Sequence, residues 1–313
     1  MTAAPAFGDT LVARVAERES QVVLGLDPDP AALWPVGGGA ATGDGTPAEA
    51  ACRAILGHCR ALIDATAEAC VAIKLQLARF EALGAGGWTA MGELAAHARN
   101  LGLLVIADGK RGDIDVSAEA YASALIGGLD TPFGRIEGLG ADLVTVNPLM
   151  GRDAVEPFVA AARRAGGGVL ALVRTSNPGA ADIEDLELEG GGAVWERMAA
   201  MVDELGRPGV GEAGLSDVGA VVGATEPSHL ARARELMGAA TFLLPGVGAQ
   251  GGRVEDLAPA FAPGRAGGLV TASRSIANAH LLAGGEPARA ARAEAERLRG
   301  AAWELADSVL AAG

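Results

Sequence analysis

Two lysines stand out among the charged residues of the chain. Lys74 and Lys110 are the only lysines among 25 lysine and arginine residues. Each ends an apolar run, VAIK at 71–74 and LLVIADGK at 103–110, which is typical of a buried strand. A lysine ammonium can shift its pKa and give up a proton, whereas the guanidinium of arginine stays charged. The two lysines therefore indicate proton-transfer chemistry at strand ends. The alternative is a coding bias against lysine that left two by chance.

The second lysine lies between two carboxylates. In the segment ADGKRGDI at 107–114, Asp108, Lys110 and Asp113 follow a buried strand with the spacing D-x-K-x-x-D. This is the most specific segment of the chain, and it makes the three side chains candidates for a catalytic cluster. Taken alone, the octapeptide is also compatible with a salt-bridge cluster on a surface loop.

Eight short apolar runs, each bounded by turn residues, would position such side chains. They lie at 21–27, 71–77, 103–110, 141–148, 168–175, 218–225, 241–248 and 268–276. Helical patterns separate them, near 47–67, 88–100, 115–126, 153–165, 192–205, 227–237 and 254–261, and a long one closes the chain near 285–310. Strands that are apolar almost throughout indicate a parallel sheet with helices on both faces.

The eight strand–helix alternations predict an α/β fold, the eight-stranded (β/α)8 TIM barrel. We expect one domain over residues 1–313, with loop insertions near 37–45 and 179–192. An open doubly wound sheet is the alternative, because periodicity does not show closure. In a barrel, the active site lies at the C-terminal ends of the strands. The polar residues at those predicted ends are Asp27, Lys74, Asp108, Lys110, Asn147, Thr175, Ser176 and Arg274.

Composition excludes several other classes of function. A formal net charge of −14 opposes attraction to nucleic acid or to an anionic membrane, and aromatic residues make up only 4% of the chain. There is no apolar run of membrane-spanning length and no signal-peptide pattern, so we expect a cytoplasmic protein.

The cysteine and histidine patterns predict no metal site. Three cysteines without C-x-x-C spacing suggest neither a disulfide framework nor a zinc site. The four histidines are expected in helices, away from the strand ends, as structural residues: His58, His97, His229 and His280.

Six motifs in order along the chain carry a family resemblance. Besides ADGKRGDI, they are LGLDP at 24–28, IKLQLARFE at 73–81, TSNPG at 175–179, PGVGAQGG at 245–252 and ASRSI at 272–276. Together they resemble the orotidine 5'-phosphate decarboxylases, in particular the bacterial type 2 subgroup. The resemblance implies cofactor-free decarboxylation of orotidine 5'-monophosphate (OMP) to uridine 5'-monophosphate (UMP), the last step of de novo UMP synthesis. It also implies a homodimer with shared active sites.

The resemblance implies catalytic roles as well. Lys110 would stabilise the negative charge that develops at C6 of the pyrimidine and then deliver a proton to that carbon. Asp108 would lie beside the departing carboxylate and hold the lysines. Lys74, Asp108, Lys110 and Asp113 would form an alternating charged array, with Asp113 contributed by the partner subunit.

Substrate-binding residues follow from the same resemblance. Asp27 and Lys74 would bind the ribose, and Ser176 the amide edge of the pyrimidine. Arg274 would bind the 5'-phosphate through its guanidinium group. Residues of a loop would complete the phosphate site: Gly246, Gly248, Gln250 and Gly251. Ile114 and Ser117 would enter the neighbouring site with Asp113, although Ser117 stands where the family often has threonine.

Two other functions remain open from the sequence. One is a Mg²⁺-dependent decarboxylase or aldolase acting on sugar phosphates, which would share D-x-K-x-x-D but need a further carboxylate near the second strand. The other is a nucleotide-binding barrel without catalysis.

Overall fold

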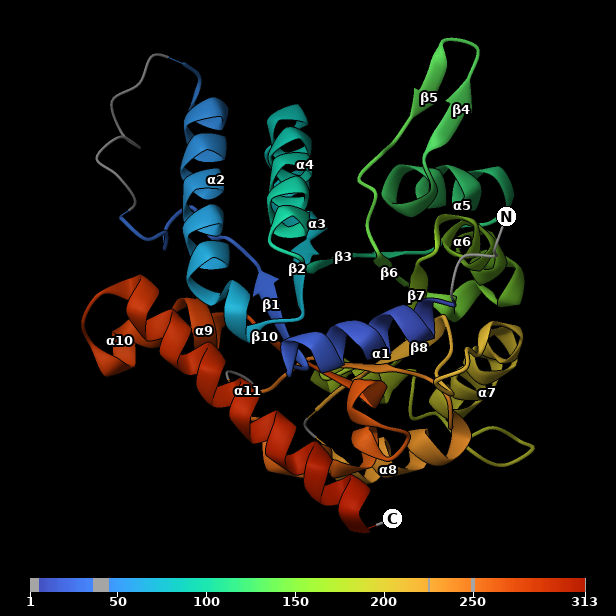
Figure 1. Ribbon diagram of the computed structural model, residues 1–313. Coiled ribbons are helices and arrows are strands. Elements are labelled where there is room, and N and C mark those ends of the chain that lie inside the picture. The colour runs from blue at the N-terminus through green and yellow to red at the C-terminus, as the bar shows by residue number, and fades with distance from the viewer. Residues whose placement is uncertain (1–5, 36–44, 225, 249–250, 313) are drawn as a thin grey trace.

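The computed structural model describes residues 6–35, 45–224, 226–248 and 251–312 (Figure 1). Its parallel strands close into a barrel in the order β1-β10-β9-β8-β7-β6-β3-β2. These strands are β1 (Val22–Leu26), β2 (Ala72–Gln76), β3 (Leu104–Arg111), β6 (Leu143–Val146), β7 (Gly168–Arg174), β8 (Val218–Val222), β9 (Phe242–Leu244) and β10 (Gly268–Ala272). Because β1 pairs with both β2 and β10, the barrel predicted from the sequence is confirmed and the open sheet is wrong.

Alternation along each strand divides the buried side chains into two groups. On β3, Val105 and Ala107 belong to the core between the strands and the surrounding helices. Leu104 and Ile106 belong instead to a second core inside the barrel. Successive side chains of a strand point to opposite faces, so Asp108 and Lys110 continue the inward-facing row of Leu104 and Ile106.

A helix outside the ranges predicted from the sequence closes one end of the barrel. Helix α1 (Phe7–Arg18) places Phe7, Leu11 and Val15 in the interior core, against residues near the N-terminal ends of the strands. These positions repeat every four residues and share one helix face. With this end closed, the barrel interior is open to ligands from the opposite end, where the strands terminate.

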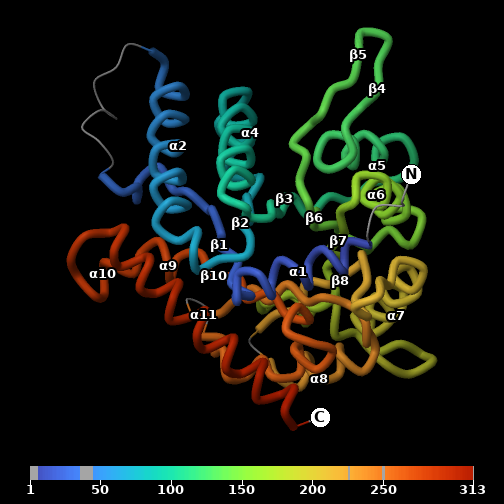
Figure 2. Tube along the Cα trace, in the orientation of Figure 1, coloured from blue at the N-terminus to red at the C-terminus, as the bar shows by residue number. Residues whose placement is uncertain are grey.

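Helices surround the barrel, as Figures 1 and 2 show. They are α2 (Pro47–Thr66), α3 (Leu77–Glu81), α4 (Ala85–Asn100), α5 (Asp115–Ala122), α6 (Arg152–Ala165), α7 (Val194–Gly206), α8 (Pro227–Leu236), α9 (Arg274–Ala277), α10 (Ala279–Ala283) and α11 (Pro287–Ala312). The helix expected near 254–261 is a 3-10 helix, Val254–Phe261, which has Pro259 inside it. Proline lacks the N–H that an α-helix interior needs.

A β-hairpin interrupts the expected alternation after α5. Its strands β4 (Leu129–Thr131) and β5 (Gly134–Ile136) pair antiparallel and project beyond α5 (Figures 1 and 2). The hairpin follows a π-helical turn, Ser123–Gly127. Its apolar side chains lie in solvent, with Phe133 fully exposed. The sequence pattern did not predict this element, because its strands are only three residues long.

Most of the glycine-rich insertion near 37–45 lies outside the described residues, whereas the insertion near 179–192 is described in full. We propose that the chain is one domain, because helices near both ends, α1 and α11, pack on the same barrel. Among the residues described, no helix is long and apolar enough to cross a membrane.

Candidate active site

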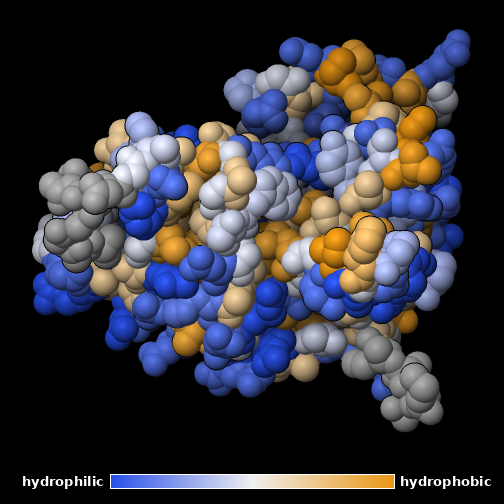
Figure 3. Space-filling model, turned by 90° about the horizontal axis from the view of Figure 1, so that it is seen from above, coloured by the Kyte–Doolittle hydropathy of each residue, from blue (hydrophilic) through white to orange (hydrophobic). Residues whose placement is uncertain are grey.

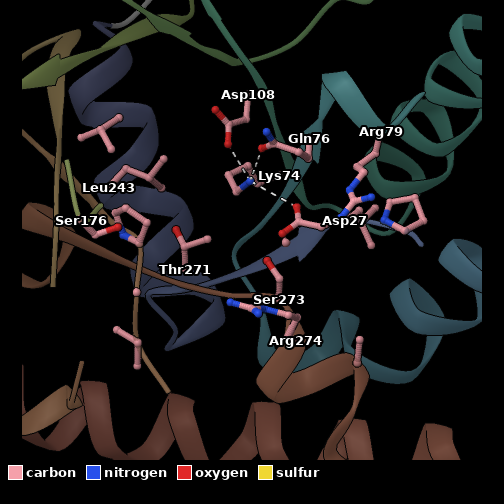
Figure 4. A pocket seen from close by; sticks show the side chains of 18 of the residues that line it. Asp27, Lys74, Gln76, Arg79, Asp108, Ser176, Leu243, Thr271, Ser273 and Arg274 are labelled. Atoms are coloured by element: carbon pink, nitrogen blue, oxygen red, sulfur yellow. Dashed lines mark hydrogen bonds and ion pairs between the residues drawn. The ribbon is translucent and has the colours of Figure 1, made fainter. Parts of the chain in front are cut away.

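A cavity of about 860 Å³ opens at the C-terminal ends of the barrel strands. Figure 4 shows its side chains converging from different strands and from the loops that follow them. Eight of the candidate site residues expected from the sequence line it: Asp27, Lys74, Asp108, Lys110, Thr175, Ser176, Gly246 and Arg274.

A chain of charges runs across the wall formed by β2 and β3. Lys74 Nζ lies 2.7 Å from Asp108 Oδ2, and Lys110 Nζ lies 2.6 Å from Asp108 Oδ1. Lys74 Nζ also donates to Gln76 Oε1 at 3.1 Å and lies 3.6 Å from Asp27 Oδ1. The pairing of β2 with β3 sets Gln76 beside Asp108, which brings the lysine of one strand to the carboxylate of the next.

Burial and neighbouring charge oppose each other in this cluster. Burial works to raise the pKa of Asp108, but the two lysine ammonium groups outweigh it and lower that pKa to about 2. Burial also works to lower the pKa of Lys74, yet Asp108 and Asp27 raise it above its usual value. Both groups are therefore charged at neutral pH. Lys110 is less enclosed, with 44% of its side chain exposed.

Lys110 has an unusual backbone conformation. Its φ angle is +48°, in the left-handed region that residues other than glycine rarely adopt. Its N–H donates to Thr145 Oγ1 at 2.9 Å, and Thr145 Oγ1 donates to Asp108 Oδ1 at 2.9 Å. Thr145 on β6 is fully buried and was not found from the sequence.

Arginines provide positive charge around the cavity. Arg274 at the start of α9 and Arg79 in α3 both line it. Among the residues that the structure describes, no carboxylate forms an ion pair with either guanidinium. Two cations without a protein counter-charge are suited to an anionic ligand.

The innermost part of the cavity is mostly apolar. Leu172, Val221 and Leu243 line it, each on a different strand. Thr271 on β10 also faces this region (Figure 4), and its hydroxyl is buried without a hydrogen-bond partner among the described residues. A ligand that reaches this depth would meet apolar contacts and one available hydroxyl group.

The segment that holds Ser176 is fixed by contacts on two sides. On one side, the backbone at Ser176 packs closely against Gly223, which follows β8. A Cβ atom added to Gly223 would lie only 3.0 Å from the Cα of Ser176, so the contact leaves little room for a side chain there. On the other side, the Glu184 carboxylate accepts from the N–H and the hydroxyl of Thr175 at 2.8 and 2.9 Å. Asp185 forms a bidentate pair with Arg174, with N···O distances of 2.8 and 2.9 Å.

The acidic stretch at 182–189, which its composition alone would assign to a solvated face, contributes to the site. Glu184 lines the cavity and packs on the T-S-N-P turn. Arg174 at the end of its strand could have indicated that a nearby carboxylate folds back onto the site. An arginine enclosed at a strand end needs a carboxylate partner.

Three residues expected at the site do not line the cavity of their own chain: Asp113, Ile114 and Ser117. They lie where β3 leads into α5. The Asp113 carboxylate accepts from the N–H of Ile114 at 2.9 Å. Ile114 and Ser117 are exposed to solvent.

The loop after β9 is only partly in contact with the cavity. Gly246 and Val247 line it, whereas Gly248 and Gly251 do not, and Gln250 lies outside the described residues. Gly246, Gly248 and Gly251 all have positive φ angles, and the N–H of Gly248 bonds to the Gly252 carbonyl at 2.9 Å. These glycines therefore shape a tight turn at the rim.

Asn147 lies at a strand end, where a polar residue could line the cavity or form a turn. It does not line the cavity, and its Oδ1 accepts from the N–H of Leu149 at 3.1 Å, which is a turn contact.

His58 was expected away from the strand ends, but it lines the cavity edge. Its Nδ1 accepts from the N–H of Trp34 at 3.1 Å, and burial lowers its pKa to about 4. Within the described part of the chain, no three His, Cys, Asp or Glu side chains form a group able to hold a metal ion.

Several residues that line the cavity were not among the site residues expected from the sequence, although strand periodicity could have identified them. Gln76 lies two residues after Lys74, and Thr271 and Ser273 are also two residues apart. Side chains at i and i+2 of a strand share a face. Polar residues at that spacing near a strand end are therefore candidates for the same wall.

Comparisons with known proteins agree with this geometry. Residues 20–293 match the family model described as Orotidine 5'-phosphate decarboxylase / HUMPS family. The curated orotidine 5'-phosphate decarboxylase of Deinococcus radiodurans is 45% identical over 241 residues, 77% of this chain and 83% of that protein. The protein of that name from Azoarcus sp. is 40% identical over 300 residues, 94% of this chain and 97% of the relative.

A solved structure extends the likeness to three dimensions. The Leishmania donovani OMP decarboxylase structure is 30% identical and covers 96% of this chain, with 99% of its own chain included and a TM-score of 0.68. The resemblance inferred from the motifs is thereby confirmed, and the chain belongs to the Orotidine 5'-phosphate decarboxylase / HUMPS family.

Proposed function

We propose that this protein converts OMP into UMP and CO2 in pyrimidine biosynthesis, without a cofactor. The observation that carries the proposal is the Lys74–Asp108–Lys110 chain of charges, in which Lys74 and Asp108 are buried, at the wall of a cavity large enough for a nucleotide. The names of the curated relatives support the same reaction.

The reaction places unusual demands on a site. When the C6–carboxylate bond breaks, its electron pair stays on a ring carbon that has no adjacent carbonyl to accept it. A fixed cation near C6 lowers the energy of that charge. The ammonium of Lys110 would supply the cation and then donate one of its protons to C6. The neutral amine left behind would regain a proton from water.

Asp108 would hold this ammonium in place. It accepts from Lys74 on one oxygen and from Lys110 on the other, so its carboxylate cannot rotate without breaking an ion pair. Its low pKa keeps it ionised at neutral pH. A carboxylate next to the substrate's own carboxylate would also raise the energy of the bound substrate, and that repulsion is relieved as CO2 leaves.

The remaining cavity residues suit the other parts of the nucleotide. Arg274 has no carboxylate partner among the described residues and would bind the 5'-phosphate, with backbone of the loop that includes Gly246. Asp27 and Lys74, 3.6 Å apart, would bind the ribose hydroxyls. Ser176 would contact the amide edge of the pyrimidine.

We propose that the functional unit is a homodimer with shared active sites. Asp113, Ile114 and Ser117 do not line the cavity of their own chain, yet Asp113 completes the D-x-K-x-x-D spacing. In a dimer that apposes the β3–α5 loops, the three would enter the partner's cavity. We also propose a cytoplasmic location, where three unpaired cysteines are compatible with reducing conditions.

The sugar-phosphate alternative finds less support in the geometry. It needs a carboxylate near β2, but β2 presents Lys74 and Gln76 to the cavity. The next carboxylate along the chain, Glu81, is paired with Arg111. The non-enzymatic alternative is opposed by the relatives, which are named as decarboxylases.

The direct test is the ultraviolet absorbance of OMP mixed with purified protein in excess EDTA. Rapid loss of the orotate chromophore, with UMP as product, is the expected result. Loss of decarboxylase activity on EDTA addition, with recovery on addition of Mg²⁺, would instead favour the metal-dependent enzymes that act on sugar phosphates. Binding of UMP without turnover of OMP would instead indicate a nucleotide-binding barrel.

A further inference from the structure

Thr145 connects the backbone of one charged residue to the side chain of another. Its hydroxyl oxygen lies 2.9 Å from the Lys110 nitrogen and 2.9 Å from Asp108 Oδ1. Thr145 is fully buried and does not line the cavity. It therefore sits behind the two charged residues, where it can act on them without touching a ligand.

The direction of both hydrogen bonds is determined by their partners. The backbone N–H of Lys110 can only donate, so the hydroxyl oxygen accepts there. The Asp108 carboxylate, when ionised, can only accept, so the hydroxyl proton points to Oδ1. A single O–H group satisfies both, and a methyl group in its place would satisfy neither.

The strand pairing explains why this hydroxyl is needed. Ala107 pairs with Val144 and Arg111 with Val146, so three residues of β3 face the single residue Thr145 of β6. Such a bulge interrupts the ladder of backbone hydrogen bonds and redirects side chains. Within it, Lys110 has φ +48°, and its N–H bonds to Thr145 instead of to a strand carbonyl.

We propose that Thr145 is a positioning residue, whose hydroxyl holds the bulged backbone of Lys110 and the Asp108 carboxylate in the arrangement that proton transfer to C6 requires. This inference rests on the proposed function. It adds a specific dependence: catalysis needs a hydroxyl at position 145, not only a side chain of that volume.

The test compares Thr145→Val with Thr145→Ser. Valine keeps the shape but has no hydroxyl, and we expect kcat for OMP to fall roughly 10- to 100-fold, with the KM and the affinity for UMP nearly unchanged. Serine restores the hydroxyl, and kcat should return to within a few-fold of wild type. Thr241→Val is the matched control. Thr241 is also buried and donates to a backbone carbonyl, but it precedes β9 at the opposite end of the barrel.

A second readout isolates the proton-transfer step. The group that protonates C6 also removes that proton in the reverse direction, so wild-type protein should exchange the C6 hydrogen of UMP for deuterium in D2O. We expect Thr145→Val to slow this exchange by a factor similar to its loss of kcat, while Thr241→Val leaves the exchange unchanged. A role in folding alone would lower the melting temperature of both valine variants without slowing the exchange.

The outcomes separate this inference from the proposed function. If wild-type protein does not decarboxylate OMP, the proposed function fails, and the role of Thr145 fails with it. If wild type is active and Thr145→Val matches it in kcat and exchange, the inference alone is overturned. Should Thr145→Val not fold, Thr145→Ala takes its place. Equal kcat for the Ala and Ser variants would then overturn the proposal.

Discussion

Lys74 and Asp108 form an ion pair of 2.7 Å between neighbouring strands, and both residues are more than 90% buried. Placing two charges in the barrel interior requires that each offset the desolvation of the other. Lys110 and Asp27 extend this pair toward the cavity, where the charges become accessible to a ligand. The pair therefore keeps two buried charges compensated in the fold and also forms part of the charged wall of the cavity.

Removing Lys74 should destabilise the protein. In Lys74→Met, Asp108 stays buried and the half-exposed Lys110 is the one cation still paired with it, and we expect a loss of about 3–5 kcal/mol in the free energy of unfolding. Urea denaturation measures this loss. The double variant Lys74→Met with Asp108→Leu should recover much of the stability, because no buried unpaired charge remains at these two positions, yet stay inactive. A double variant as unstable as the single one would contradict this account.

Stability should fall at acidic pH through Asp108. Its folded pKa of about 2 is below the usual 3.8, so its stabilising contribution is present above about pH 4 and is lost as pH falls toward 2. The difference between these two pKa values corresponds to about 2 kcal/mol in the free energy of unfolding. Denaturation of wild type and Asp108→Asn between pH 5 and 2 measures it. The wild-type curve should fall more steeply, and parallel curves would show that Asp108 does not carry this dependence.

Lys110→Ala should abolish turnover and leave the fold nearly intact. The side chain is 44% exposed, so its loss removes little buried surface, whereas the proposed mechanism loses its cation and its acid. We expect kcat to fall by roughly 10³-fold or more, with a small change in melting temperature. Steady-state kinetics with OMP is the measurement. A kcat close to that of wild type would exclude Lys110 as the proton donor.

Arg274→Ala should act mainly on binding. With the phosphate contact removed, we expect KM for OMP to rise roughly 10- to 100-fold. Orotidine, which lacks the phosphate, should show a smaller defect. Arg14→Ala serves as a control, since Arg14 pairs with Glu17 on the exposed side of α1. Equal defects of Arg274→Ala on both substrates would contradict its assignment to the phosphate.

Mixing two inactive variants tests the shared site. Lys110→Ala and Asp113→Ala should each be inactive alone and should regain some activity when their subunits exchange. One site of the mixed dimer would then hold both wild-type residues. Subunit exchange is verified by native mass spectrometry of differently tagged chains. Verified exchange without recovery would show that Asp113 serves its own chain or none.

The positions of the strands and of the charged side chains at their ends followed from the sequence, because both are local properties. Apolar runs with turn residues between them located every barrel strand to within four residues at either end. Two-residue spacing placed Asp108 and Lys110 on one face of β3. The order of six short motifs was enough to identify the family.

Contacts between distant segments were decided only by the tertiary structure. Thr145 is an ordinary threonine in an apolar run until the bulge in β3 brings Lys110 and Asp108 to its hydroxyl. Glu184 reaches the cavity only because its loop folds back on Thr175. The apolar face of α1 acquires its role when the closed barrel leaves one end to cover. Local pattern determines which residues form each strand, whereas hydrogen bonds and ion pairs between strands depend on register and closure, which no single segment encodes.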